Sequence, residues 1–150
     1  MDAIDQKDQK ILEALKQNSR QSMHQIAKKT MIPVTTVFNR VKRLERLGVI
    51  KAYTIEVDQK KLGKILSGYI LANVDYNDLK KYNYSQKGIA ELIAKLPEVE
   101  SVTIMAGGTD LIIAVHVASI EELSNFVTDK LRNLGGIEKT NTLIALEKVK

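Results

Sequence analysis

SMHQIAKKTMIPVTTVFNRVKRLERLGVI, residues 22–50, is the stretch that decides the fold of the first third of this chain. Apolar residues recur at helical spacing on both sides of Pro33, which predicts two helices joined by a short turn. Ser22 is a suitable N-cap for the first helix, and Gly48 is a suitable residue just after the second. Two short helices in this arrangement are typical of a DNA-binding domain.

The second helix has an apolar side and a polar side when its residues are placed about 100° apart. The apolar side, expected in the core, consists of Val34, Val37, Phe38, Val41 and Leu44. The polar side carries the residue types that read base edges, namely Thr35, Thr36, Asn39, Arg43 and Arg46. Asparagine suits adenine, arginine suits guanine, and a threonine methyl suits the thymine methyl. Arg40 and Lys42 lie at the two edges of the polar side and are candidate phosphate contacts.

The flanking residues predict the rest of a winged helix-turn-helix domain. Helical spacing of Ile4, Ile11, Leu12 and Leu15 predicts a preceding helix from Asp5 to about Asn18. After Gly48, the sequence VIKAYTIEV (residues 49–57) alternates in polarity and predicts an extended ribbon, the wing. A charged helix face is also what an ordinary solvated helix presents, so the helix pair taken alone leaves that interpretation open.

Positive charge is concentrated in the same half of the chain. Residues 1–62 contain 13 Lys and Arg against 7 Asp and Glu, a balance of +6, whereas residues 63–150 contain 10 against 11, a balance of −1. Basic charge confined to the half with the helix pair is the electrostatic footprint of a module that contacts phosphates. The expected partner is double-stranded DNA.

Composition excludes several classes of protein. Hydrophobic residues make up 44% of the 150 residues, which is enough for one domain or two small ones. Cysteine is absent, and this excludes disulfides, thiolate metal sites and cysteine nucleophiles. The opening MDAIDQKDQK does not resemble a signal peptide, and no apolar run approaches the roughly 20 residues of a membrane helix. We expect a globular, cytoplasmic protein with no membrane partner.

The second half has a different periodicity, after a polar linker that contains DQKKLGK, residues 58–64. Strands are predicted over residues 67–75, 99–106, 110–117 and 137–149, and helices over 85–95 and 119–134. Ser119 is the expected N-cap of the last helix, with Glu122 completing a capping box. Residues 107–109 are expected to form the turn of the central hairpin, and residues 76–84 an irregular loop.

This order of elements is the ferredoxin-like βαββαβ unit. The predicted fold class is therefore α+β. Its parts are an N-terminal winged helix-turn-helix domain over residues 1–57, a linker over 58–66, and a C-terminal ferredoxin-like domain over 67–150.

An ordered set of residues along nearly the whole chain resembles the leucine-responsive regulator (Lrp/AsnC) family, also called feast/famine regulators. The set consists of Ile4-Asp5, Asp8, Ile11-Leu12, Leu15, Ile26-Ala27-Lys28-Lys29, Arg40-Val41-Lys42-Arg43-Leu44-Glu45, Gly48-Val49-Ile50-Lys51, Leu62-Gly63, Leu96-Pro97-Glu98-Val99, Gly107 and Asp110. The resemblance implies a sequence-specific transcriptional regulator. It further implies a second domain that binds an amino acid or related small metabolite and forms dimers, which assemble further.

The resemblance also implies an effector site near a Gly-x-x-Asp turn, which here is Gly107, Gly108, Thr109 and Asp110. Glycine at a turn exposes backbone N–H groups that can bind a carboxylate, and the carboxylate of Asp110 can bind an α-ammonium group. The hydroxyls of Thr140 and Thr142 on the last strand are further candidates. The alternative is that the glycines only make the hairpin turn and that Asp110 caps it.

Three departures from the family pattern are local. Met31 stands where a glycine with left-handed backbone is usual, so strain is expected there. Pro33 stands where a serine N-cap is usual, and its side chain cannot cap a helix. Gly108 and Thr109 stand where an acidic and an aromatic residue are common, which leaves the identity of the effector open.

Other functional classes have less support. His24 and His116 have no second ligand nearby in the sequence, and the isolated glycine pairs form no phosphate loop, so we expect no catalytic centre, metal or cofactor. The strands lack the glycine-aromatic motif that stacks RNA bases. The remaining alternative is a small-molecule sensor or assembly module whose N-terminal domain binds a protein. DNA binding is steeply salt-dependent, whereas protein binding through an apolar face is not.

Overall fold

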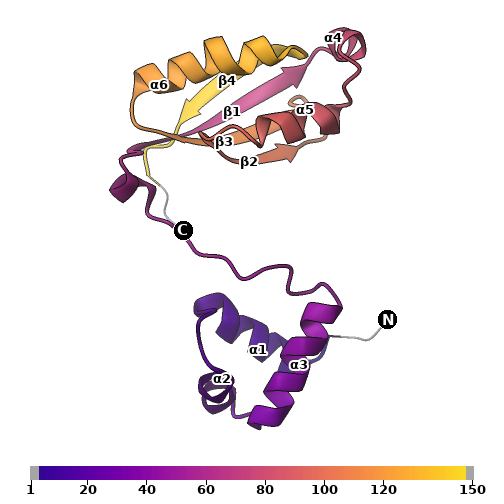
Figure 1. Ribbon diagram of the computed structural model, residues 1–150, viewed down its shortest axis with the longest axis vertical. Coiled ribbons are helices and arrows are strands. Elements are labelled where there is room, and N and C mark those ends of the chain that lie inside the picture. Colours follow the sequence, from indigo (N-terminus) through magenta and orange to yellow (C-terminus); the bar gives the residue numbers. More distant parts are fainter. Residues whose placement is uncertain (1–3, 148–150) are drawn as a thin grey trace. The chain divides into compact units, whose positions relative to one another are not determined.

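The computed structural model describes residues 4–147, and the chain divides between Glu56 and Val57 into two compact units (Figure 1). The N-terminal unit contains α1 (Gln6–Gln17), α2 (Met23–Thr30) and α3 (Val34–Arg46). Asp5 and Ser22 cap the first two helices, and the N-cap role of Ser22 is the one predicted. Each cap is a reciprocal capping box. The apolar faces of all three helices meet in a core of Ile11, Ala14, Leu15, Ile26, Ile32, Val37 and Val41.

The turn between α2 and α3 has the strained backbone expected at Met31. This residue is left-handed, with φ 58° and ψ 34°, and its side chain is 89% exposed. The next residue, Ile32, is buried, and its N–H donates to the carbonyl of Ala27. Burial of Ile32 offsets the strain at Met31. Pro33 precedes α3 without any side-chain cap, as expected.

The predicted ribbon after Gly48 does not form within the described chain. Gly48 has φ 69° and closes α3, and the N–H of Val49 donates to the carbonyl of Leu44. Residues 51–58 then lie outside any helix or strand. A strand needs a hydrogen-bonding partner, and residues 4–147 supply none to this segment. Tyr53 and Ile55 are consequently exposed.

The C-terminal unit has the predicted ferredoxin-like order of elements. After η1 (Gln59–Leu62), its antiparallel sheet is ordered β2-β3-β1-β4. The strands are β1 (Leu66–Val74), β2 (Val99–Ile104), β3 (Leu111–Val117) and β4 (Ile137–Ile144). Between them lie α4 (Tyr76–Lys81), α5 (Gln86–Ile93) and α6 (Ile120–Asn125), the last continuing into the π-helical η2 (Phe126–Leu131) and the 3-10 helix η3 (Arg132–Leu134).

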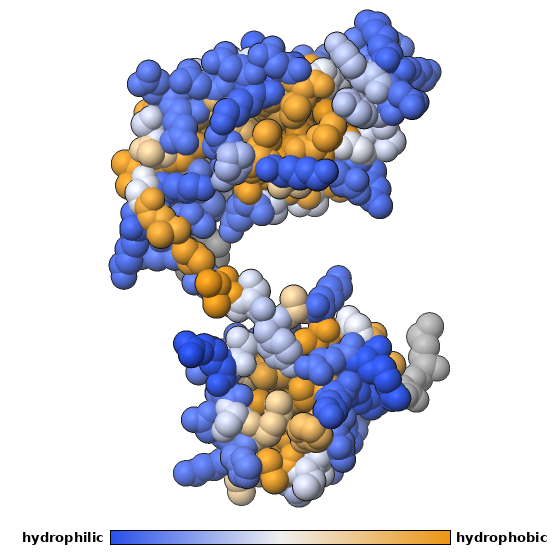
Figure 2. Space-filling view, viewed as in Figure 1, coloured by the Kyte–Doolittle hydropathy of each residue, from blue (hydrophilic) through white to orange (hydrophobic). Residues whose placement is uncertain are grey.

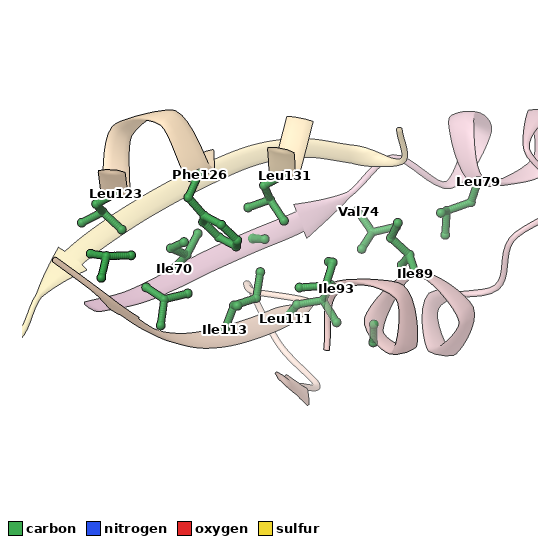
Figure 3. Close-up of a cluster of buried hydrophobic side chains, with 14 residues drawn as sticks. Ile70, Val74, Leu79, Ile89, Ile93, Leu111, Ile113, Leu123, Phe126 and Leu131 are labelled. Carbon is green, nitrogen blue, oxygen red and sulfur yellow. The ribbon is translucent and has the colours of Figure 1, made fainter. Parts of the chain in front are cut away.

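One face of this sheet carries the core. Figure 3 shows Phe126 and Leu131 from the last helical segment and Ile89 and Ile93 from α5 gathered on the strand residue Ile70 and its neighbours. Side chains alternate along a strand, so the residues between the buried ones lie on the other face. Tyr69 on β1 and Leu143 on β4 pair across that second face and are both exposed. The sheet is therefore covered by helices on one side only.

The prediction of an irregular loop over residues 76–84 is wrong, because residues 76–81 form α4. The side chain of Asp75 accepts hydrogen bonds from the N–H groups of Asn77 and Asp78, and Leu79 is buried. Leu79 of α4 packs on Gly136, and Tyr82, just after the helix, packs on Gly135, where a Cβ atom would lie 2.6 Å from its ring. Because these contacts join residues more than 50 positions apart, no pattern among neighbouring residues predicts them.

Two further predictions need correction, one on the end of the last strand and one on the cap of α6. The last strand ends at Ile144, which pairs with Gly68. One more hydrogen bond follows, from the N–H of Ala145 to the carbonyl of Ser67, and β1 itself begins one residue further, at Leu66. The predicted end at Val149 lies outside the described residues. Ser119 caps α6 as expected, but the side chain of Glu122 accepts from the N–H of Ala118 instead of completing the box on Ser119.

Candidate nucleic-acid interface and effector turn

The outward side of α3 carries most of the predicted base-reading residues. Val37, Val41 and Leu44 are buried on the inner side, as predicted. The exposed residues are Thr35, Asn39, Lys42 and Arg46, while Thr36 is half-buried. These side chains are therefore held on a helix whose opposite side is fixed in the core.

Phe38 was predicted to lie in the core, and this prediction is wrong. Its side chain is 45% exposed, and the Nζ atom of Lys42 lies 4.4 Å from the centre of its ring. The three-helix core is small and closes over Val37 and Val41, so the neighbouring position on the helix is left at the edge. Figure 2 shows apolar residues among hydrophilic ones on the N-terminal unit. Phe38 thus belongs to the outer surface of α3.

Arg40 and Arg43 are both tied to α1. The carboxylate of Asp8, which is fully buried, accepts from Arg40 at 2.9 Å and from Arg43 at 3.0 Å. Asp5 binds Arg40 at 2.7 Å. The N–H of Asp8 and then the Arg40 guanidinium lower the pKa of Asp5, and the two carboxylates raise the pKa of Arg40.

This network was missing from the sequence predictions, and the three-residue spacing of Asp5 and Asp8, which suits a capping box, was a signal that went unused. It holds the inner guanidinium groups of α3 in fixed positions. The charges of Arg40 and Arg43 are compensated, whereas no carboxylate within residues 4–147 pairs with Lys42 or Arg46, so these two side chains carry the positive charge on the outer side of α3. The roles assigned to Arg40 and Arg43 on DNA stay predictions.

The turn between β2 and β3 is anchored by Asp110. One carboxylate oxygen accepts from the N–H of Val74 at 2.9 Å, and the other accepts from the hydroxyl of Tyr76 at 3.1 Å. The carbonyl of Gly108 accepts from the side chain of Asn73 at 2.9 Å. Hydrogen bonding to Asp110 raises the pKa of Tyr76. Both anchoring side chains, Asn73 and Tyr76, were missed by sequence reasoning because they lie on a different element.

The other candidate effector residues divide between the turn itself and β4, which lies on the far side of β1 from β3. Gly107 has φ 139°, and no atom lies within 4 Å of a Cβ built at Gly107 or Gly108, so the turn is open. Thr109 is half-buried. On β4, Thr140 pairs with Ala72, whose carbonyl accepts the N–H of Asp110. Thr142 pairs with Ile70, two residues farther along β1 and away from the turn.

The histidines do not form a metal site. His116 bonds to Ser67 at 2.8 Å and to Glu100 at 3.0 Å across the open face of the sheet. Among residues 4–147, no group of three or more His, Cys, Asp or Glu side chains is placed to hold a metal ion. In the same part of the chain, no helix is long and apolar enough to cross a membrane.

Known proteins match both units. Residues 4–51 match the winged helix-turn-helix DNA-binding family, and residues 79–150 match the Lrp/AsnC ligand binding domain. An uncharacterized HTH-type transcriptional regulator of Pyrococcus abyssi is 38% identical over 147 residues, which cover 98% of this chain and 95% of the relative.

Two solved structures have the same fold. LrpC of Bacillus subtilis is 30% identical, with a TM-score of 0.83 over 99% of this chain and 98% of that one. A transcriptional regulator of Neisseria meningitidis, solved in complex with L-methionine, has a TM-score of 0.88 over 99% of this chain and 93% of that one. At 22% identity the second likeness concerns the fold alone.

The helical unit with its exposed polar helix and the attached ligand-binding unit define a DNA-binding transcriptional regulator, not an enzyme. The chain belongs to the Lrp/AsnC family.

Proposed function

We propose that this regulator binds specific DNA sequences by placing α3 in the major groove. The observation that carries the proposal is the outward side of α3, where the exposed Asn39 lies among Thr35, Lys42 and Arg46. An asparagine amide can bind adenine through two hydrogen bonds, and the cationic side chains can contact phosphates. The charge balance of +6 in residues 1–62 supports contact of this unit with DNA phosphates.

The second part of the proposal is a homodimer, the unit from which larger assemblies form. The sheet has one uncovered face with exposed apolar side chains, including Tyr69 and Leu143. The segment that contains Tyr53 and Ile55 is exposed and lacks a strand partner among residues 4–147. Both surfaces suit contact with a second copy. Two copies of α3 then enter successive major grooves about 34 to 36 Å apart.

The third part is an effector of the amino-acid class at residues 107–110. The open turn offers backbone N–H groups to a carboxylate. Among residues 4–147, the donors to the Asp110 carboxylate are neutral, namely the Val74 N–H and the Tyr76 hydroxyl, so its negative charge is available to an ammonium group. The hydroxyl of Thr140 completes the candidate site, with Thr142 as its most distant member.

The test is binding to labelled DNA at two salt concentrations in the presence of excess random DNA. A fragment from upstream of the protein's own gene is the first choice, with sites selected from a random library as the second. Tight, competitor-resistant binding that weakens steeply with salt supports the proposal. Binding to no DNA at either salt concentration contradicts it and favours the alternative, a sensor whose N-terminal unit binds a protein.

A further inference from the structure

The exposed ring of Phe38 borders a shallow hollow on the outer surface of the N-terminal unit. The hollow has a volume of about 450 Å³, and its lining consists of Met23, His24, Val34, Thr35, Phe38 and Asn39. Most of this lining is apolar, and all of it comes from the start of α2 and the first half of α3. An apolar surface therefore lies directly beside Asn39, the residue proposed to read a base.

A phenylalanine in this position is not explained by packing or by attraction to phosphates. The ring is 45% exposed, so it contributes only part of its area to the core. The ammonium group of Lys42 lies over one face of the ring, 4.4 Å from its centre, which holds the ring in place. The remaining surface, toward Val34 and Thr35, is left for an apolar group brought by a ligand.

We propose that this hollow binds the C5 methyl group of a thymine next to the base read by Asn39, with Phe38 as the specificity-determining residue. Thymine is the only standard base that presents a methyl group in the major groove. The inference rests on the proposed function, since it requires α3 in the groove. It goes beyond that proposal because it names a base and a group on that base.

The experiment compares thymine with deoxyuridine, which lacks only the methyl group. A preferred site is first selected from a random library with the full chain, and each thymine in it is then replaced by deoxyuridine, one at a time. At one thymine in each half-site, we expect the Kd to rise about fourfold, the effect of one buried methyl group. In a second comparison, that thymine-adenine pair is replaced by a cytosine-guanine pair with or without a 5-methyl group on the cytosine. We expect the protein to bind the methylated DNA more tightly than the unmethylated DNA.

The variant Phe38→Ala is expected to lose the difference between thymine and deoxyuridine. Met31→Ala is the matched control, because Met31 is an exposed apolar residue of the same unit outside the hollow, and its variant should keep the full ratio. Circular dichroism and unchanged binding to random DNA at low salt show that Phe38→Ala is folded.

Two results overturn the inference while leaving the proposed function intact. One is sequence-specific binding in which no deoxyuridine changes the Kd of the unaltered protein by more than about twofold. The other is a fourfold effect that persists in Phe38→Ala, since another residue then contacts the methyl group. If the selection yields no preferred site, the proposed function fails, and the inference fails with it.

Discussion

Asp8 in the N-terminal unit and Asp110 in the C-terminal unit both tie a candidate functional segment to a distant part of the chain, but their partners differ. Asp8 is fully buried and faces the guanidinium groups of Arg40 and Arg43. Asp110 is half-buried and accepts from a backbone N–H and a phenol. In the first case the charge of the carboxylate is compensated internally. In the second no charged donor among the described residues compensates it, which is why we propose Asp110 as an effector-binding group. The partners of a carboxylate, and not its residue type, distinguish a structural anchor from a candidate binding group.

The largest effect is expected from Asp8→Asn, which removes the charge that faces both arginines. Loss of one partner from a buried ion pair costs about 3 to 5 kcal/mol. Arg40 keeps Asp5 and both arginines reach solvent, so we expect the lower end, about 3 kcal/mol less free energy of unfolding for the N-terminal unit. Urea unfolding followed by circular dichroism measures this. Glu13→Gln, an exposed change on the same helix, is the control, and equal stability of the two variants would show that Asp8 is not an anchor.

Asn39→Ala tests the surface that the Asp8 network supports. We expect a loss of about 1 to 3 kcal/mol on the preferred site and relaxed specificity at one base pair, because the amide reads a base edge. Lys42→Ala is the matched comparison and should weaken all sequences alike while lowering the salt slope by about 1. Kd values on preferred and random DNA check both. An equal loss on the two DNAs for Asn39→Ala would exclude base reading.

Asp110→Asn tests the other carboxylate. The amide oxygen can still accept from the N–H of Val74, so the turn should remain anchored, but the negative charge is lost. Isothermal titration with a panel of amino acids, L-methionine included, is expected to show at least about tenfold weaker binding, about 1.4 kcal/mol. The exposed Asp129→Asn is the control. Unchanged ligand affinity in Asp110→Asn would leave Asp110 as an anchor only.

The smallest expected effect is the pH dependence of the stability of the N-terminal unit. The pKa of Asp5 is lowered in the folded state, chiefly by the N–H of Asp8 and then by Arg40. A carboxyl with a lowered pKa stabilises the fold above its unfolded pKa of about 4, and this contribution disappears as pH falls through the lower folded value. Asp5→Asn should therefore reduce the free energy of unfolding at pH 6, but not at pH values below the folded-state pKa of Asp5. A variant with the same deficit at every pH would contradict this account.

Several features of the fold were predictable because their causes are local. Ser22 and Ser119 cap helices through hydrogen bonds to residues three positions away. The left-handed backbone at Met31 was implied by the family resemblance, and the order of strands and helices in the second unit was expected from periodicity. The candidate DNA-contacting surface was largely visible in the alternation along α3. These patterns depend on neighbours within one or two turns of the chain.

The sequence by itself determined the starts of α1, α2, α5 and α6, the α+β order of elements and the concentration of positive charge in one half. Only the tertiary structure decided that Phe38 faces outward, that Arg40 and Arg43 meet Asp8, and that Asp110 meets β1. The carboxylate and its partners in these last contacts lie 32 to 36 residues apart. Periodicity reports which side of an element is apolar. It does not report how large the core is, or which distant charged residue lies against that element. Those are properties of packing in three dimensions, where a small core leaves an aromatic ring outside and brings a buried carboxylate to two arginines.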